Sequence, residues 1–479
     1  MQKKFVVNLF LLVAINLLIK PFWILGVERG VQNAVGPAGY GLYYALFNFS
    51  FLFNIIIDFG LNNYNNSFIS KHPQLLSKQF SQALVLKGLL IIVYLVITLF
   101  SAMLYGYKGW ALQMLLVLCF NQVLSFGITF LRSCVSGLQF FFTDSLLSVL
   151  DRFLMILICG SLLWLGPAGN FNIKWFIISQ TASYVITLVI SYFVIHPHIR
   201  RLVLSFNKPF LISLLKRSAP YALLGVLMSV YTKADGILIE RWLTRGAEKA
   251  GQYASAYRLL DAANMMGVLF AGLLLPMFSR MLAAKHDLSK LVRTAFVLIF
   301  FPSLILSVCC YLYAGPIMSL LSKHCDEEAI SVFKWLMLSF IPVCWVYIFG
   351  TLLTALGKHK LLIWIALIAC VINVGFNLLF MKNYGIQACA ISSLLTQLFV
   401  GASHIALTFS RLKLHLGKYF LLRIVIFASV FMVVATTISV MPFLWITNML
   451  LTLIGSIAIL AFSGFFKGSD LKLIFSKEI

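Results

Sequence analysis

The chain has 479 residues, of which 61% are hydrophobic and only 11% are charged, and its mean hydropathy is +0.98. A soluble domain keeps about 25% charged residues because its surface faces water, so this composition excludes a soluble enzyme or binding module. Apolar runs of about 20 residues recur along the chain, and each is long enough to cross a hydrocarbon core of about 30 Å. The sequence therefore predicts an all-α polytopic membrane protein.

In chain order, the apolar runs predict about fourteen transmembrane helices. The first run has no small-residue cleavage site, so we expect it to be retained as a helix rather than removed as a signal peptide. Barrel strands would show alternating segments of about ten residues instead. The predicted spans are 5–27, 39–60, 83–104, 109–131, 143–165, 173–195, 218–239, 253–279, 294–320, 331–354, 361–381, 385–409, 419–440 and 444–465.

The formal net charge of +23 follows the predicted topology. If both termini are cytoplasmic, most of the 37 lysines and arginines fall in cytoplasmic segments, Lys87 among them. This asymmetry is the positive-inside rule of membrane proteins. We therefore expect the charge to report orientation in a membrane, with membrane lipids and not nucleic acid as its partner.

Two hairpins open on the same pattern, G-x4-G-x-Y: GPAGYGLY at 36–43 and GAEKAGQY at 246–253, offset by 210 residues. The repeat predicts an N-terminal lobe of six helices (residues 1–205) and a C-terminal lobe of six (206–415). Two additional helices and a cytoplasmic tail follow (416–479). Duplicated bundles are a recurrent transporter design, in which the substrate is held between the halves near the midplane.

The sequence carries no motif of soluble catalysis. It has no P-loop, HExxH or GxSxG pattern, and its nine cysteines form neither CxxC nor a Cys/His metal spacing. We expect no enzyme activity, no cofactor and no metal site. A transporter of this kind would be driven by a gradient of H+, Na+ or the substrate itself.

Ionisable side chains inside apolar runs are costly, so they normally face a bundle interior, a water-filled cavity or a partner. Asp58 and Asp144 lie near inner helix ends, where a solvated or capping carboxylate is the plain alternative. The candidates are Lys20, Asp58, Asp144, Asp151, Arg152, Lys233, Asp235, Arg258 and Asp261.

The seventh and eighth spans are predicted to form a hairpin with its apex near Gly246. Residues equidistant from the apex lie at similar depth, since both helices rise 1.5 Å per residue. Asp235 is then placed opposite Arg258, and Lys233 opposite Asp261. Lys233 and Asp235 are about 200° apart on their own helix and cannot share a face. A structural charge network and a role in transport or ion coupling both remain open.

If Lys233 and Asp261 are partners, exchanging their charges should restore what either single change removes. We expect Lys233→Asp and Asp261→Lys each to impair transport, and the double exchange to recover it. Transport by a deletion strain that expresses each variant is the measurement. A double variant as inactive as the singles would argue against the pair.

Lys20 has no such mirror partner, because the residue opposite it across Gly36 is Leu52. It either snorkels to the interface or contacts an anionic substrate, and we expect the contact. Asp151 and Arg152 are adjacent and differ by about 100° around their helix, so they are expected to face separate partners. A structural pairing with a neighbouring helix and a contact with an anionic headgroup are both open for Arg152.

The stretches around these charges resemble the polysaccharide biosynthesis flippases, the Wzx-type members of the MOP exporter superfamily that carry O-antigen or capsule repeat units. The resemblance extends roughly over residues 8–415. The stretches are YTKADGILIERWL, GQYASAYRLLDA, GLLLPMFSRML and the opening NLLIKPFWILGVERGVQNAVGPAGYGLYYALFNFSFLFNIIIDFGLNN.

The resemblance implies a V-shaped pair of six-helix bundles with two extra helices and a cationic central cavity. Members of the family move undecaprenyl-diphosphate-linked oligosaccharides, including lipopolysaccharide precursors, from the cytoplasmic to the periplasmic leaflet. The expected substrate contacts are Lys20, Arg152, Lys233 and Arg258, and the expected charge network for ion coupling is Asp58, Asp151, Asp235 and Asp261. Glycan polymerase or export proteins are possible partners.

Three alternatives stay open. A lipid II flippase or a multidrug and toxin exporter would share the architecture, although many exporter substrates are cations that favour an acidic cavity. A polysaccharide polymerase is also polytopic, but it would need substantial outer loops, and none is long enough here.

Overall fold

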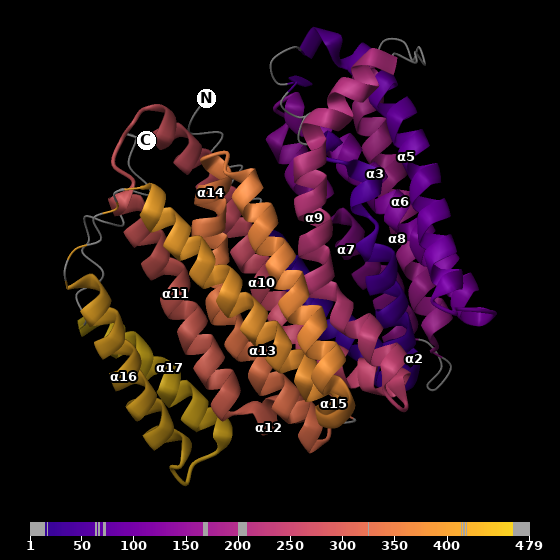
Figure 1. The fold of residues 1–479 in the computed structure, drawn as a ribbon. Helices are drawn as coiled ribbons and strands as arrows, with labels where there is room; N and C mark the ends of the chain where they lie inside the picture. Colours follow the sequence, from indigo (N-terminus) through magenta and orange to yellow (C-terminus); the bar gives the residue numbers. More distant parts are fainter. Residues whose placement is uncertain are drawn as a thin grey trace. The chain divides into compact units, whose positions relative to one another are not determined.

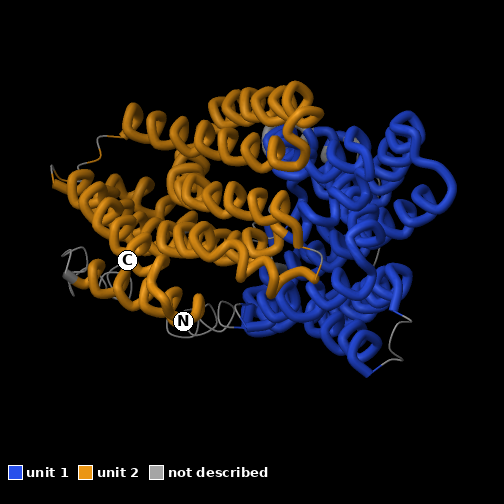
Figure 2. Tube along the Cα trace, turned by 90° about the horizontal axis from the view of Figure 1, so that it is seen from below, with its two compact units in different colours: residues 1–255 blue, residues 256–479 orange. Residues whose placement is uncertain are grey.

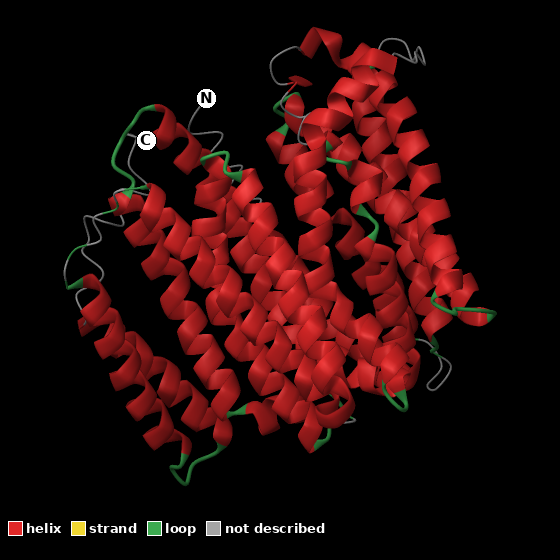
Figure 3. Cartoon of the chain, in the orientation of Figure 1, coloured by secondary structure: helices red, strands yellow, loops and turns green. Residues whose placement is uncertain are grey.

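The computed structural model describes residues 15–16, 18–62, 65, 68–69, 73–165, 171–199, 208–323, 325–412, 414, 417 and 419–462. These residues form helices joined by short loops, and no strand occurs among them (Figure 3). The prediction of an all-α chain is confirmed. The start of the first predicted span, the predicted lobe boundary at 205/206 and the cytoplasmic tail lie outside the described residues.

The chain divides into two compact units, residues 1–255 and 256–479 (Figure 2). The first unit begins with helical residues from Leu18 onward that lead into a π-helical segment. Its main elements (Figure 1) are η1 (Trp23–Glu28), α2 (Arg29–Leu52), α3 (Ile55–Asp58), α5 (Leu76–Leu104), α6 (Trp110–Gly137), α7 (Phe141–Trp164), α8 (Ile173–Ile195) and α9 (Lys208–Trp242).

Helix α10 (Gly246–Ala283) begins in the first unit and continues into the second. The second unit keeps the expected succession of apolar helices, although a break splits the predicted span 294–320 into α11 and α12. Its further elements (Figure 1) are α11 (Ser289–Leu312), α12 (Ala314–Leu321), α13 (Glu327–Trp345), η4 (Val346–Gly350), α14 (Thr351–Ala355), α15 (His359–Arg411), α16 (Phe420–Ser439) and α17 (Trp445–Phe462).

Eleven helices of the described residues are long and apolar enough to cross a membrane. Two of them contain a non-helical glycine: Gly36 (φ 80°) within Leu18–Asp58, which lies between two predicted spans, and Gly385 (φ 57°) within α15, which is the first residue of a predicted span. Glycine adopts positive φ without the steric penalty of a Cβ, so it allows the chain to turn there. The shorter apolar helix α17 follows α16. The exact number of crossings stays a prediction.

The break at Gly385 is capped from another helix. Glu328, at the start of α13, accepts a hydrogen bond from the backbone N–H of Ile386 at 3.1 Å. The backbone N–H groups in the first turn of a helix have no acceptor within that helix, so a side-chain acceptor stabilises the break. The cap therefore fixes the turn between the two halves of α15.

Each unit has its own aromatic core. In the first, Phe80 of α5 and Phe130 of α6 stack with ring centroids 5.3 Å apart. In the second, Phe301 of α11 meets Phe427 of α16 edge-on at 4.6 Å, so α16 is fixed against the bundle. Many large apolar side chains on the helices are exposed, which is the surface that a bilayer would cover.

Candidate functional site

The first helix and α7 are held in register by polar side chains. The Asn16 amide donates to the Ser148 hydroxyl at 3.0 Å. Lys20 lies four residues after Asn16, and Arg152 lies four residues after Ser148. Because the first and fifth spans are predicted to run in the same direction, this register sets Lys20 level with Arg152. Consistently, the Lys20 ammonium is within electrostatic range of Arg152 and Asp151.

Arg152 is the centre of this group. Its guanidinium carbon lies 5.8 Å from the ring centroid of Trp23 and 6.0 Å from that of Tyr184, within the range of cation–π attraction. Its Nε lies 3.5 Å from a carboxylate oxygen of Asp151. Three elements, η1, α7 and α8, thus converge on one cation.

The contact with Asp151 corrects the sequence argument, which gave these two neighbours separate partners. Their Cβ atoms do diverge by about 100° around α7. The long arginine side chain nevertheless curls back far enough for its Nε to meet the carboxylate. The 100° angle between the two Cβ atoms therefore does not prevent contact between the Asp151 carboxylate and the Arg152 guanidinium.

Lys20 is half-buried, and among the described residues no carboxylate oxygen lies within 4 Å of its ammonium. The sequence argument searched for its counter-charge only across the first hairpin. The structure instead brings the nearest acid, Asp151, from α7, more than 120 residues away in sequence. The structure brings together three of the predicted site residues, Lys20, Asp151 and Arg152.

Glu28 belongs to the same region and was missed from the sequence. It closes the π-helical segment η1 and accepts a hydrogen bond from the Tyr40 hydroxyl. It also lies within electrostatic range of Arg152 and Tyr43. The predicted span ended at residue 27, so Glu28 was taken as part of a loop. Continuation of the apolar pattern beyond Glu28, in GVERGVQNAVG, was the signal that could have found it.

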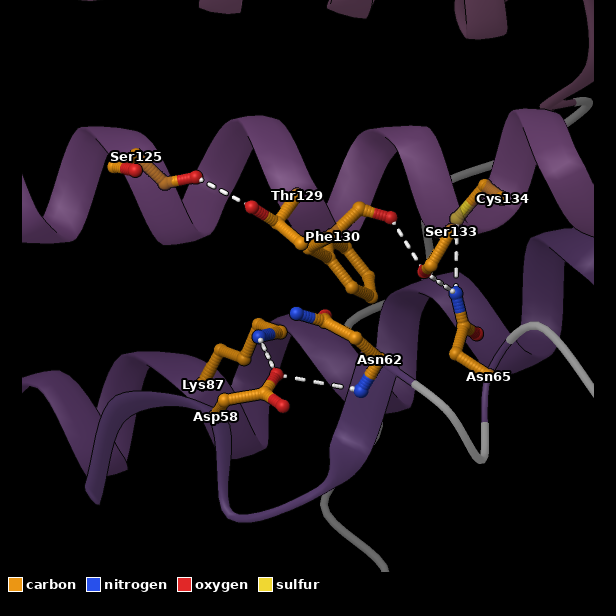
Figure 4. A network of polar contacts seen from close by, with 9 residues as sticks. All are labelled: Asp58, Asn62, Asn65, Lys87, Ser125, Thr129, Phe130, Ser133 and Cys134. Atoms are coloured by element: carbon orange, nitrogen blue, oxygen red, sulfur yellow. Dashed lines mark hydrogen bonds and ion pairs between the residues drawn. The ribbon is translucent and has the colours of Figure 1, made fainter. Parts of the chain in front are cut away.

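Asp58 is buried in a polar network rather than solvated (Figure 4). Lys87 of α5 donates to its carboxylate at 3.0 Å, and the backbone N–H of Asn62 donates to the same oxygen at 3.3 Å. The chain leaves α3 through Phe59 and Gly60, both with positive φ. Lys87, predicted to be a cytoplasmic topology charge, is 5% exposed. The sequence argument was wrong on the surroundings of both residues.

Breaking this ion pair is expected to cost about 3–5 kcal/mol, because the remaining charge stays buried without compensation. We expect Lys87→Met and Asp58→Asn each to lower the yield and the unfolding temperature of the detergent-purified protein. The double variant should recover most of that loss. The control is Arg132→Met at the more exposed pair Arg132–Asp144 (2.8 Å), where a smaller loss is expected. A double variant worse than both singles would contradict this account.

Asp235 is 2% exposed and accepts a hydrogen bond from the Tyr253 hydroxyl at 2.8 Å. The hairpin loop contains only residues 243–245, so its centre is Thr244, two residues before the predicted apex. Asp235 and Tyr253 are both nine residues from Thr244. Moving the centre by two residues moves the opposite position by four, about one turn. Tyr253 thus takes the place that the sequence argument gave to a residue one turn later.

For the other three charged residues of this hairpin, the structure gives the burial of the side chains. Lys233 and Asp261 are half-buried, and Arg258 is buried. All three make interactions of their own within the structure. The predicted pairs of Asp235 with Arg258 and of Lys233 with Asp261 stay predictions, as do their roles in binding or coupling.

The repeated hairpin motifs meet each other inside the first unit. A Cβ added to Gly41 would overlap the carbonyl oxygen of Ala247, and one added to Gly251 would overlap that of Pro37. Gly251 is Gly41 moved by 210 residues, and Ala247 is Pro37 moved by the same offset. Each copy of the motif thus places its second glycine against the residue that follows the first glycine of the other copy. We call this pair of contacts the glycine crossing.

Polar contacts strengthen the region around the glycine crossing. The Gln32 amide donates to the Gly251 carbonyl at 2.7 Å and also to the Ser255 hydroxyl. Nearby in sequence, at the end of α9, Glu240 accepts from the Tyr107 hydroxyl at 2.8 Å. The end of α9 is thus tied to the loop between α5 and α6, and the first turns of α10 are tied to α2.

The profile of the family described as Polysaccharide biosynthesis protein matches residues 7–282, more than half of the chain. The chain belongs to this family. Among curated proteins, none matches this sequence. The family resemblance deduced from the sequence is thereby confirmed.

Solved structures of transporters share the fold of this chain. Lipid II flippase MurJ in an inward closed conformation superposes with a TM-score of 0.70 at 16% identity, over 91% of this chain and 95% of that one. A multidrug resistance MATE family transporter of the MOP superfamily in an inward-facing conformation gives 0.62 at 15% identity, over 82% and 94%. Its outward-facing conformation gives 0.59 at 15% identity, over 85% and 94%.

At these identities the likeness shows the fold alone. The chain is therefore a multi-pass membrane protein with the fold of MOP-superfamily transporters. The matched range contains all the predicted site residues: Lys20, Asp58, Asp151, Arg152, Lys233, Asp235, Arg258 and Asp261.

Proposed function

We propose that the protein is a flippase that moves an undecaprenyl-diphosphate-linked oligosaccharide from the cytoplasmic to the periplasmic leaflet of a bacterial inner membrane. One observation carries the proposal: two cations, Lys20 and Arg152, lie level with each other on helices held in register. The family supports a role in polysaccharide biosynthesis, and the fold supports transport.

A diphosphate suits this pair of cations. Like charges at one depth in a low-dielectric region repel each other, so an anion between them lowers the energy of the site. A guanidinium binds phosphate oxygens in a fork, and an ammonium adds a mobile point charge. We propose that Lys20 and Arg152 bind the diphosphate in a cationic cavity. Lys233 and Arg258 would then contact later parts of the path.

Alternating access is the transport mode that we propose, with both termini in the cytoplasm. The glycine crossing and the Tyr107–Glu240 contact then serve as an outer seam, which opens when the substrate leaves. Asp58, Asp151, Asp235 and Asp261 are candidates for coupling to H+ or Na+. Glycan polymerase or export proteins would receive the product.

A lipid II flippase is the second candidate, because MurJ shares the fold. The family match to polysaccharide biosynthesis favours a glycan repeat unit instead. A multidrug exporter is less favoured, since charged side chains of both signs, and not acids alone, occur within the predicted spans. A polymerase is the least favoured, because the loops between the described helices are short.

The experiment that tests this function is the identification of the lipid that accumulates without the protein. In a deletion strain we expect an undecaprenyl-diphosphate oligosaccharide on the cytoplasmic leaflet and loss of the surface glycan. Accumulation of lipid II would favour the second candidate. Unchanged lipid-linked intermediates with altered drug sensitivity would reject the flippase proposal.

A further inference from the structure

The two rings that face Arg152 are themselves immobilised by packing. Trp23 is 4% exposed and stacks on Phe176 with the ring planes 4° apart. Tyr184 is 5% exposed, and its hydroxyl accepts a hydrogen bond from Gln180 at 3.4 Å. The rings come from η1 and α8, on elements separate from the α7 helix that carries Arg152. The position of the Arg152 guanidinium is thus determined by two packed aromatic rings rather than by its own flexible side chain.

Asp151 defines which side of the guanidinium is occupied. Its carboxylate lies 3.5 Å from Nε. Among the described residues, the terminal Nη nitrogens of Arg152 have no hydrogen bond or ion pair. The Arg152 side chain as a whole is 26% exposed, so part of it is open to a ligand. The Nη edge is also the edge that binds a phosphate in a fork.

We infer that Trp23 and Tyr184 are positioning residues for the substrate, acting through Arg152. With Asp151 on Nε and the two rings beside the guanidinium carbon, the Nη edge is kept available for the diphosphate. This inference rests on the proposed function. It extends that function by assigning the orientation of the key cation to two aromatic residues that do not themselves bind the phosphate.

The rings act by their π-faces, which attract a cation irrespective of a hydroxyl group. Tyr184→Phe keeps the ring and removes the hydroxyl, whereas Tyr184→Leu keeps an apolar side chain of similar burial and removes the ring. Trp23→Phe and Trp23→Leu make the same comparison at the other ring. Loss of a ring leaves Arg152 charged but free to turn away, so the ligand must restore its orientation on binding.

The experiment measures binding of geranylgeranyl diphosphate to the purified full-length protein in detergent by calorimetry. We expect Tyr184→Leu and Trp23→Leu each to weaken binding about tenfold, and the two phenylalanine variants to stay within about threefold. Arg152→Ala serves as the reference and should weaken binding more than either ring variant. The unfolding temperature of each variant shows that it is folded.

A positioning role further predicts non-additivity. In the Arg152→Ala background, Tyr184→Leu should have no further effect, because there is no guanidinium left to orient. An equal loss in both backgrounds would mean that the ring acts structurally, and would overturn the inference. So would phenylalanine variants as weak as the leucine ones. If Trp23→Leu does not fold, the Tyr184 series decides alone.

The two proposals fail differently. If Arg152→Ala leaves the affinity unchanged, the diphosphate site of the proposed function is wrong. If Arg152→Ala weakens binding and both leucine variants bind normally, the diphosphate site stands and only the positioning role is rejected.

Discussion

Lys20→Ala is expected to reduce export of the lipid-linked glycan roughly 10- to 150-fold, while the protein stays folded and inserted. The change removes one of the two cations that lie level with each other, and a charged hydrogen bond contributes about 1.5–3 kcal/mol. The surface glycan and the accumulated lipid-linked intermediate are the measurements. No carboxylate within 4 Å is left unpaired among the described residues, so a fold defect is not expected.

Two variants control for this experiment. Lys20→Arg keeps the charge and should retain most of the export. Lys174→Ala removes a lysine from the start of α8, where its ammonium lies over the Trp110 ring at 4.7 Å, and should export normally. Normal export from Lys20→Ala, at a normal level in the membrane, would remove Lys20 from the site.

Gly251→Ala is the second change for which we expect a large effect. A single added methyl group would overlap the backbone carbonyl of Pro37, so the two helices at the glycine crossing must separate. Overpacking of this kind costs about 1–3 kcal/mol and displaces the backbone. We expect export to fall to background and the unfolding temperature in detergent to drop. Gly41→Ala should do the same through Ala247.

The matched control is Gly88→Ala in α5, where nothing lies within 4 Å of the added methyl group. Alanine is about 0.8–1 kcal/mol better than glycine in a helix interior, so this variant should be at least as stable as the wild type. Since either glycine change separates the same crossing, the double variant should be little worse than the singles. Additive losses would show that the two contacts are independent.

The fold could be predicted from the sequence because hydropathy determines where a helix can cross a bilayer. Helix α8 was predicted with the bounds that the structure gives, Ile173–Ile195. The break at Gly36 falls between two predicted spans for the same reason, and the break at Gly385 falls on the first residue of the predicted span 385–409. Helix ends outside the apolar core were less accessible: α5 begins at Leu76, seven residues before the predicted span.

The candidate site was predicted only in part, because sequence spacing relates residues within one hairpin and not between distant helices. Lys20 was selected as an unusual charge, but its neighbours on α7 depend on helix packing. Likewise Lys87 looked like a cytoplasmic charge, since nothing in the sequence places it beside Asp58. The Tyr253–Asp235 bond was missed because a turn of only three residues shifts the register.

The Asp58–Lys87 pair has a consequence for how the chain enters the membrane. The two residues are 29 positions apart, so at about 5–20 residues per second the ribosome delivers Lys87 some 1.5–6 s after Asp58. During that interval Lys87 gives the carboxylate no counter-charge, and an unpaired aspartate in a membrane helix is costly, by up to about 2.5–3.5 kcal/mol at the helix centre on insertion scales. We therefore expect the segment around Asp58 to insert together with α5, as one hairpin.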